Sequence, residues 1–280
     1  MPGSAGQALE AARARLAAAS KNPRRDAEVL LARVLGWDQA ALLAHPERIL
    51  SPAELAKYES FLTRRAASEP IQYITGEQEF FGLLFEVSPD VLIPRPETEH
   101  LVEAVLERVV REAKVRIVDV GTGSGAVAVA LAHALPRAQV TAVDLSPAAL
   151  EVARRNAQRH GLSQRMTFLQ SDLLAAIDGA EFDVVVSNPP YVAEGEVLEP
   201  QVSNYEPHSA LYAGPTGLEI YERLIPQAGR VLRPQGWLML EVGYGQQPAV
   251  EGLLRGWNAV SFVRDLRGIP RVVQAQKHAT

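Results

Sequence analysis

The sequence predicts an α/β protein, in which a Rossmann-like domain with a parallel sheet follows a small N-terminal helical bundle and is joined to it by a β-hairpin. Three observations lead to this prediction. From residue 115 onward, β-branched runs alternate with helical patterns, as in βαβ units. Residues 4–68 carry only helical patterns, and residues 70–94 are rich in β-prone segments broken by glycine. We therefore expect a helical bundle over 1–69, a hairpin linker over 70–94 and the Rossmann-like domain over 95–280.

Composition limits the possible functions. The 280 residues are 47% hydrophobic and 22% charged, which is typical of a globular protein. The net charge is −5 and no long basic run is present, so no stable nucleic-acid partner is expected. The absence of cysteine excludes disulfides, thiolate zinc sites and cysteine nucleophiles. The six histidines are scattered without zinc-ligand spacing, and we expect no metal site.

The chain carries no pattern that would send it to a membrane. Met1-Pro2-Gly3-Ser4 leads into an Ala/Arg-rich helical pattern, unlike a signal peptide. No apolar stretch approaches the roughly 18 residues that a membrane span needs. We expect a soluble, cytoplasmic protein.

Helix signals divide the first 68 residues. An Ala-rich pattern covers 7–19, and Asn22-Pro23 then supplies an N-cap followed by proline at the first helical position. That second helix should end at Gly36. Ser51-Pro52-Ala53-Glu54 reads as a capping box that opens a helix over 55–67. These helices form the expected bundle, and paired arginines within them are expected to be solvated.

The pattern changes after Glu69-Pro70. The segments 71–74, 79–81 and 83–87 are β-prone and are separated by glycines, which predicts strands and a hairpin. Arg95 then lies between two prolines, and Pro96 starts a helix with acidic residues in its first turn. Two flanking prolines restrict the backbone on either side of this cation, and we expect the Arg95 side chain to face an interaction partner.

The remaining chain alternates regularly between the two kinds of pattern. Strands are expected over 115–120, 139–143, 166–170, 182–187, 237–242, 259–264 and 271–276. Helices are expected up to residue 134, over 147–160 and 218–231, and after residue 246. This order predicts a mostly parallel sheet with helices on both faces.

A glycine-rich turn follows the first expected strand of this sheet. Gly121, Thr122, Gly123, Ser124 and Gly125 lead from the strand into a helix, where free N–H groups can meet a nucleoside cofactor. Asp144 ends the next strand, where its carboxylate can accept both ribose hydroxyls.

Gly121, Gly123 and Ala126 also satisfy the dinucleotide pattern of NAD enzymes. Three features favour S-adenosylmethionine over NAD. Asp119 precedes the first glycine by two residues and Gly125 tightens the turn. Ser171-Asp172 follows the third strand, where it can reach an adenine, and the loop after the fourth strand has no role in hydride transfer.

That loop is Asn188-Pro189-Pro190-Tyr191, at the end of the apolar strand 182–187. The prolines stop the strand and hold the loop extended at the sheet edge where open α/β proteins bind ligands. An amide, backbone carbonyls and an aromatic face suit a planar amide or amino group. An ordinary Asn-Pro turn is the simpler alternative for the same letters.

Taken together, these motifs resemble a known family. The glycine loop and Asp144 resemble class I methyltransferases, and Asn-Pro-Pro-Tyr resembles enzymes that methylate a planar nitrogen. The segments 73–99 and 205–218 are similar to the peptide-chain release factor glutamine N5-methyltransferases (PrmC/HemK). The likeness covers roughly residues 70–244. It departs at 213–216, where the family usually has a second glycine and an acid.

The resemblance implies a class I S-adenosylmethionine-dependent methyltransferase that methylates the side-chain amide of the glutamine in the Gly-Gly-Gln motif of release factors. It implies that the N-terminal bundle binds the factor. Residues implied to bind the cofactor are Gly121, Thr122, Gly123, Ser124, Gly125, Asp144, Asp172, Leu173 and Asn188, with Leu173 acting through backbone or packing. Residues implied to bind substrate are Asn188, Pro189, Pro190, Tyr191 and Arg95, of which Asn188, Pro189 and Tyr191 carry catalysis. Asn188 Oδ1 and the Pro189 carbonyl can accept the two amide hydrogens, and Tyr191 can pack on the amide plane.

Other functions remain open from the sequence. A glutamine methyltransferase of a ribosomal protein would share the Asn-Pro-Pro-Tyr loop, but its linker departs from the pattern at 95–99. A DNA adenine N6-methyltransferase fits less well, because the chain is acidic and has no target-recognition insert. A binding module without activity is the non-enzyme alternative. Glu241, at a strand end, is expected to be structural or to support the site from behind.

Overall fold

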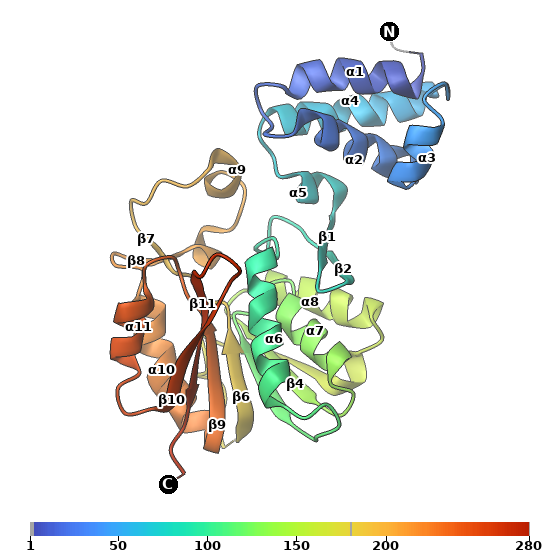
Figure 1. Ribbon diagram of the computed structural model, residues 1–280. Coiled ribbons are helices and arrows are strands. Elements are labelled where there is room, and N and C mark those ends of the chain that lie inside the picture. The colour runs from blue at the N-terminus through green and yellow to red at the C-terminus, as the bar shows by residue number, and fades with distance from the viewer. Residues whose placement is uncertain (1–2, 180, 280) are drawn as a thin grey trace. The chain divides into compact units, whose positions relative to one another are not determined.

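The computed structural model describes residues 3–179 and 181–279, which divide into two compact units (Figure 1). The helical unit comprises Met1–Glu77 and Leu198–Tyr205, and the sheet unit comprises Gln78–Val197 and Glu206–Thr280. Each unit has its own hydrophobic core. No helix among the described residues combines the length and apolar character that crossing a bilayer requires.

Local sequence signals set the ends of the bundle helices. The helices of this unit are α1 (Ala5–Leu16), α2 (Pro23–Leu35), α3 (Gln39–Ala44), α4 (Pro52–Ala66), α5 (Ile71–Thr75) and α9 (Pro200–Ser203). Asn22 caps α2 as predicted, and Gly36 ends it in the left-handed conformation. The predicted capping box of Ser51 and Glu54 is present at α4.

The prediction of a strand over 71–74 is wrong, because these residues form the short helix α5. Pro70 precedes the helix, and Gly76 ends it with a φ of 78°. The helix places Ile71 and Ile74 against the core of the bundle. Burial on one helical face has therefore overridden the β propensity of isoleucine.

A seven-stranded sheet with the order β10-β11-β9-β6-β3-β4-β5 organises the sheet unit. Its strands are β3 (Arg116–Val120), β4 (Gln139–Asp144), β5 (Met166–Gln170), β6 (Phe182–Ser187), β9 (Leu232–Glu241), β10 (Asn258–Arg264) and β11 (Pro270–Gln276). Neighbours from β9 to β5 run parallel, whereas β11 is antiparallel to both β9 and β10. The chain passes from β3 to β4 and β5 on one side and returns to β6 on the other. The β3–β6 junction is thus the switch point at which open sheets bind ligands.

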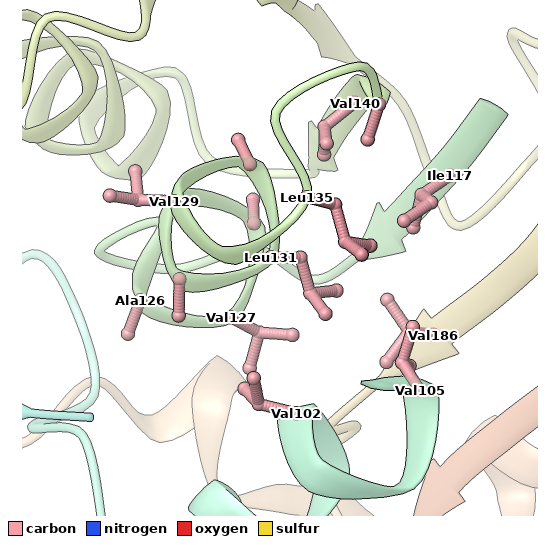
Figure 2. Close-up of a cluster of buried hydrophobic side chains, with 14 of the residues drawn as sticks. Val102, Val105, Ile117, Ala126, Val127, Val129, Leu131, Leu135, Val140 and Val186 are labelled. Carbon is pink, nitrogen blue, oxygen red and sulfur yellow. The ribbon is translucent and has the colours of Figure 1, made fainter. Parts of the chain in front are cut away.

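Helices cover both faces of this sheet, as Figure 1 shows. One face carries α6 (Glu99–Arg108), α7 (Ala126–Ala134) and α8 (Pro147–Arg159), and the other carries α10 (Glu219–Val231) and α11 (Gln247–Leu253). Strand alternation divides the apolar residues between two cores. In β6, Val184 and Val186 join the first core and Val185 joins the second. Figure 2 shows the first core, where α6 and α7 pack on Ile117 and Val186.

Shorter elements complete the sheet unit. They are η1 (Pro96–Thr98), η2 (Ser163–Arg165), η3 (His208–Ala210), β7 (Val192–Ala193) and β8 (Tyr212–Gly214). The predicted hairpin is formed by β1 (Glu77–Phe80) and β2 (Leu83–Glu86). Its turn residues Phe81 and Gly82 have φ values of 52° and 72°, the two positive values that a type I′ hairpin turn requires.

Candidate active site

A cavity of 460 Å³ opens at the carboxyl ends of the parallel strands. This volume lies in the range of small-molecule sites. The predicted cofactor residues that line it are Gly121, Thr122, Gly123, Ser124, Asp144, Asp172, Leu173 and Asn188. They come from the loops after β3, β4, β5 and β6, so the parallel sheet brings four predicted motifs together.

The glycine loop leaves room for a ligand where its backbone faces the cavity. Gly121 and Gly123 have φ values of 69° and 54°, and a Cβ on either would meet no atom within 4 Å. Gly125 is different, because a Cβ there would lie 3.0 Å from the Cβ of Ala153 on α8. Gly125 does not line the cavity; it allows α7 and α8 to approach closely, and thereby supports the loop.

Asp144 is fixed by backbone donors beside the same loop. Its Oδ2 accepts from Gly123 N and its Oδ1 from Ser146 N, each at 2.9 Å. Burial raises the pKa of Asp144, and these two N–H groups oppose the rise. The carboxylate keeps further lone pairs and faces the cavity, as a ribose acceptor requires.

Asp119 is a buried carboxyl in the cavity wall. It accepts a 2.7 Å hydrogen bond from the Thr122 hydroxyl, which fixes the start of the glycine loop. Burial raises its pKa to about 7, and the nearby Asp144 adds to the rise. In the sequence, Asp119 indicated only the type of glycine loop. Its position in the cavity wall is shown by the fold.

The loop after β5 contributes Asp172 and Leu173 to the cavity. Asp172 forms a 2.6 Å ion pair with Arg223 of α10, which also lines the cavity and carried no sequence signal. Leu173 has a φ of 53°, an uncommon value for a leucine. This backbone geometry agrees with a position that contributes through its main chain.

The loop 188–191 begins with an asparagine that is already held on one side. Asn188 Nδ2 donates to Thr98 Oγ1 at 3.1 Å. Within the described part of the chain, neither Asn188 Oδ1 nor the Pro189 carbonyl has a hydrogen-bond partner. Asn188 and Pro190 line the cavity, whereas Pro189 is buried and is not part of its wall.

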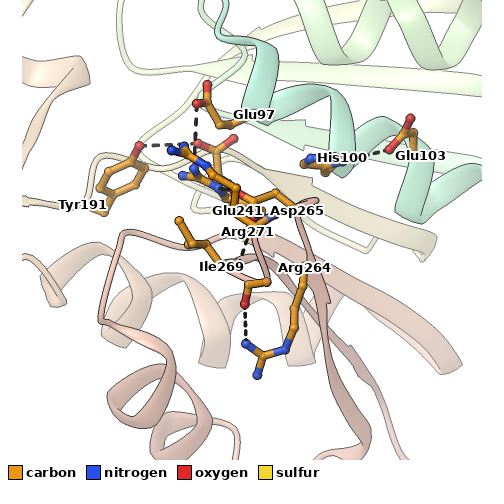
Figure 3. A network of polar contacts seen from close by, with 11 residues as sticks. Glu97, His100, Glu103, Tyr191, Glu241, Arg264, Asp265, Ile269 and Arg271 are labelled. Atoms are coloured by element: carbon orange, nitrogen blue, oxygen red, sulfur yellow. Dashed lines mark hydrogen bonds and ion pairs between the residues drawn. The ribbon is translucent and has the colours of Figure 1, made fainter.

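Tyr191 does not line the cavity, and Figure 3 shows its side chain directed toward Glu241 at the end of β9. Its hydroxyl lies 3.4 Å from Glu241 Oε1. Gln246 Nε2 donates to the Tyr191 carbonyl at 2.9 Å, and a Cβ on Gly243 would lie 3.0 Å from the ring. Gln246 and Gly243 therefore fix the tyrosine, and neither residue carried a sequence signal.

Arg95 forms an ion pair with the buried carboxylate of Glu206 in the same chain. The Arg95 Nη2 group donates to Glu206 Oε1, and Ile93 N donates to Glu206 Oε2 at 3.1 Å. These bonds attach the segment before η1 to the segment before η3. Arg95 is not in the cavity wall, and its role in substrate binding stays a prediction.

Asn156 of α8 supports the glycine loop from behind and was missed in the sequence. It is fully buried; its Nδ2 donates to the carbonyls of Ser124 and Glu86 at 2.9 Å, and its Oδ1 accepts from Glu86 N at 2.7 Å. It thus links the loop to β2. An asparagine inside an ordinary amphipathic helix carries no signal of such contacts.

No group of three or more histidine, aspartate or glutamate side chains in the described residues is arranged to hold a metal ion. That the protein uses no metal stays a prediction. The donor set of the cavity is instead made of backbone N–H groups, carboxylates and one amide.

Comparison with known families matches both parts of the chain. Residues 7–76 match the family model described as PrmC N-terminal domain, and residues 97–204 match the methyltransferase small domain. The chain is 50% identical to the release factor glutamine methyltransferase of Koribacter versatilis, over 97% of this chain and 98% of that one. It is 48% identical to the protein of the same name from Moorella thermoacetica, over 94% of this chain and 93% of that one.

Solved structures share the fold of the sheet unit at lower identity. A methyltransferase from Pyrococcus furiosus matches with a TM-score of 0.52 and 21% identity, over 71% of this chain and 91% of that one. A T. thermophilus 16S rRNA N2 G1207 methyltransferase, solved with AdoMet and guanosine, matches with a TM-score of 0.55 and 23% identity, over 72% of this chain and 50% of that one. These likenesses agree with the predicted class I methyltransferase fold.

Proposed function

The chain belongs to the release factor glutamine methyltransferase family, and on this basis we propose that it transfers a methyl group from S-adenosylmethionine to the side-chain amide nitrogen of the glutamine in the Gly-Gly-Gln motif of a release factor. The observation that supports this most directly is the state of Asn188. Its Nδ2 is engaged by Thr98, so its Oδ1 is left to accept from a ligand in the cavity.

The cavity suits the proposed cofactor. Gly121 and Gly123 offer an open backbone surface, and Asp144 offers a carboxylate for ribose hydroxyls. Asp172 and Leu173 lie on the loop after β5, within reach of a base. When bound, S-adenosylmethionine supplies an electrophilic methyl group on a cationic sulfur. The acidic side chains of the cavity wall are compatible with this positive charge.

The substrate amide is a poor nucleophile because its nitrogen lone pair is delocalised into the carbonyl. Asn188 Oδ1 and the Pro189 carbonyl can accept the two N–H groups, which would fix the nitrogen and favour its pyramidal form. Neither Pro189 nor Tyr191 lines the cavity, so contacts of the Pro189 carbonyl and the Tyr191 ring with the amide stay predictions. In this proposal, catalysis rests on positioning and on preorganised acceptors.

The experiment is a transfer assay with radiolabelled S-adenosylmethionine, the enzyme and a purified release factor, followed by peptide mass analysis. We expect one methyl group on the motif glutamine. A factor whose motif glutamine is replaced by alanine is the control and should take up no label. Label that persists on this variant, or that appears on added nucleic acid, would contradict the proposal.

A purified large-subunit ribosomal protein mixture added to the same assay tests the second glutamine activity, and we expect no label there. Duplex DNA with adenine sites tests the DNA methyltransferase alternative in the same way. We further propose that the enzyme works in the cytoplasm, where its protein substrate acts in translation, and that it has no stable nucleic-acid or membrane partner.

A further inference from the structure

Glu241 is a buried carboxyl group that takes no part in the proposed chemistry. It lies at the end of β9, is only 3% exposed and does not line the cavity. Its Oε2 has no hydrogen-bond partner among the described residues. An unsatisfied buried carboxyl is costly and needs an explanation, because a neutral side chain of similar shape would avoid the cost.

The surroundings of Glu241 connect it to both ends of the loop 188–191. The Tyr191 hydroxyl lies 3.4 Å from its Oε1, and the Thr98 hydroxyl is close enough to stabilise its ionised form. Thr98 in turn accepts from Asn188 Nδ2 at 3.1 Å. Glu241 therefore contacts Tyr191 directly, and the Thr98 hydroxyl that bonds to Asn188 lies near its carboxylate.

We propose that Glu241 is a positioning residue for methyl transfer, which orients Asn188 through the Thr98 hydroxyl and holds Tyr191 directly. This inference rests on the proposed function. It assigns Glu241 no contact with substrate or cofactor.

The direction of the hydrogen bonds is the reason. A hydroxyl has a single proton, and an ionised carboxylate can only accept. In the proposed arrangement, the Thr98 hydroxyl directs its proton toward the ionised carboxylate and accepts from Asn188 Nδ2, which leaves Asn188 Oδ1 facing the cavity. A protonated Glu241 can donate to the Thr98 hydroxyl, which can then donate its own proton to Asn188. The Asn188 amide would turn so that its Oδ1 accepts this proton. Asn188 would then present an N–H group to the substrate amide, which is the wrong polarity for binding another N–H.

The charges around Glu241 determine which state it adopts. Burial raises its pKa to about 7, Glu97 adds to the rise, and Thr98, Tyr191 and Arg271 oppose it. Figure 3 shows Glu97, Arg271 and Tyr191 around the carboxyl group. On the α10 side, the Tyr221 hydroxyl donates to the Glu241 backbone carbonyl at 2.8 Å. The competent ionised form should therefore gain population as the pH rises through about 7.

The test is Glu241→Gln, which keeps the shape and imitates the protonated acid. With S-adenosylmethionine and intact release factor, we expect kcat to fall about 10-fold or more while KM and the cofactor Kd change less than about 2-fold. The wild-type kcat should decline as the pH falls below 7, and this decline should disappear in the variant. If Glu241 had only a structural role, its replacement would leave this decline of kcat with pH in place.

A second pair of variants tests the connection through Thr98. Thr98→Val removes the hydroxyl and should lower kcat as Glu241→Gln does, whereas Thr98→Ser keeps the hydroxyl and should restore it. This pair decides the question if Glu241→Gln fails to fold. Wild-type kcat and an unchanged pH profile in Glu241→Gln, or wild-type kcat in Thr98→Val, would overturn the proposal. A wild-type enzyme that methylates no release factor would instead contradict the proposed function.

Discussion

Asn188 carries the most specific chemistry of any single residue in this chain. One end of its amide is bonded to Thr98, and the other end faces the cavity beside the exposed surface of the glycine loop. This division of a single side chain between protein and ligand predicts that neither aspartate nor alanine can replace it. Aspartate would bring a carboxylate without the N–H that Thr98 accepts.

We predict that Asn188→Ala lowers kcat by about 100-fold or more, because a preorganised acceptor for the substrate amide is lost. The cofactor Kd should change less than about 3-fold, since the glycine loop and Asp144 remain. Single-turnover methylation and calorimetric titration of the cofactor check the two quantities. Asn258→Ala, at an exposed asparagine of β10, is the matched control and should keep full activity. Equal loss of transfer and cofactor binding in Asn188→Ala would refute the assigned role.

The raised pKa of Asp119 predicts that folding stability depends on pH. Burial raises its folded pKa to about 7, above the value near 4 of an unfolded chain. Between these values the folded state holds a proton that the unfolded state has released, so the free energy of unfolding falls as the pH rises through this window. Glu241, with a pKa of about 7, acts in the same direction.

We predict that Asp119→Asn raises the free energy of unfolding at pH 8 by about 2 kcal/mol, because a neutral amide removes the buried charge and can still accept from Thr122. At pH 4 the effect should be close to zero, since Asp119 is protonated there when folded. Urea titrations at the two pH values measure the difference. A variant destabilised equally at both would show that the hydrogen bond, and not the charge, dominates.

Among the secondary-structure elements, the contact between α7 and α8 depends on one missing side chain. Gly125 has a φ of 79°, and Ala153 of α8 fills the space where a Cβ would be. The same contact holds the glycine loop at the end of β3. Packing between two helices is thus directly coupled to the geometry of the cavity.

We predict that Gly125→Ala lowers the free energy of unfolding by about 2 kcal/mol or more, because it adds a steric clash to an unfavourable φ. Gly161→Ala is the matched control: Gly161 also has a positive φ, 70°, but a Cβ there meets no atom within 4 Å. It should lose only about 1 kcal/mol. Thermal and urea unfolding compare the two. Equal losses would mean that φ strain alone explains both glycines.

In the whole molecule, we expect the two units to have different roles. The sheet unit contains every residue of the cavity, and the helical unit has a groove lined by Val29, Ala32, Arg33 and Trp37 among others. Val29 is 38% exposed, although its neighbours Glu28 and Leu30 in α2 are buried. The predicted role of residues 1–69 is to bind the release factor.

We predict that Val29→Glu raises the KM for an intact release factor by about 5-fold or more and leaves kcat unchanged, because a charge would weaken an apolar contact. The rate with a short peptide that contains the motif should not change. Steady-state assays with both substrates separate the effects. Val110→Glu, at an exposed valine of the sheet unit, is the control and should alter neither. An unchanged KM in Val29→Glu would remove this groove from the binding surface.

Most of the fold and a large part of the candidate site could be predicted from the sequence, because the signals are local. A capping box, an N-cap followed by proline, and glycines at positive φ act within a few residues and appear as short patterns. Strand and helix alternation predicted a mostly parallel sheet with helices on both faces, and the resemblance of the glycine loop implied the class I fold, which the matched families support. The helix α5 was missed because its isoleucines pack on distant parts of the bundle, which no local pattern records.

The sequence by itself determined the motifs: a glycine loop followed by Asp144, and Asn188 before two prolines. Only the tertiary structure decided how these motifs are held. Asn188 bonds to Thr98, 90 residues earlier in the chain, and Tyr191 bonds to Glu241, 50 residues later. Arg95 meets Glu206, 111 residues away, and Asn156 joins the glycine loop to a hairpin across separations of 32 and 70 residues. Such contacts depend on which strands become neighbours in the sheet, and burial then gives each polar group its bonding direction and its pKa.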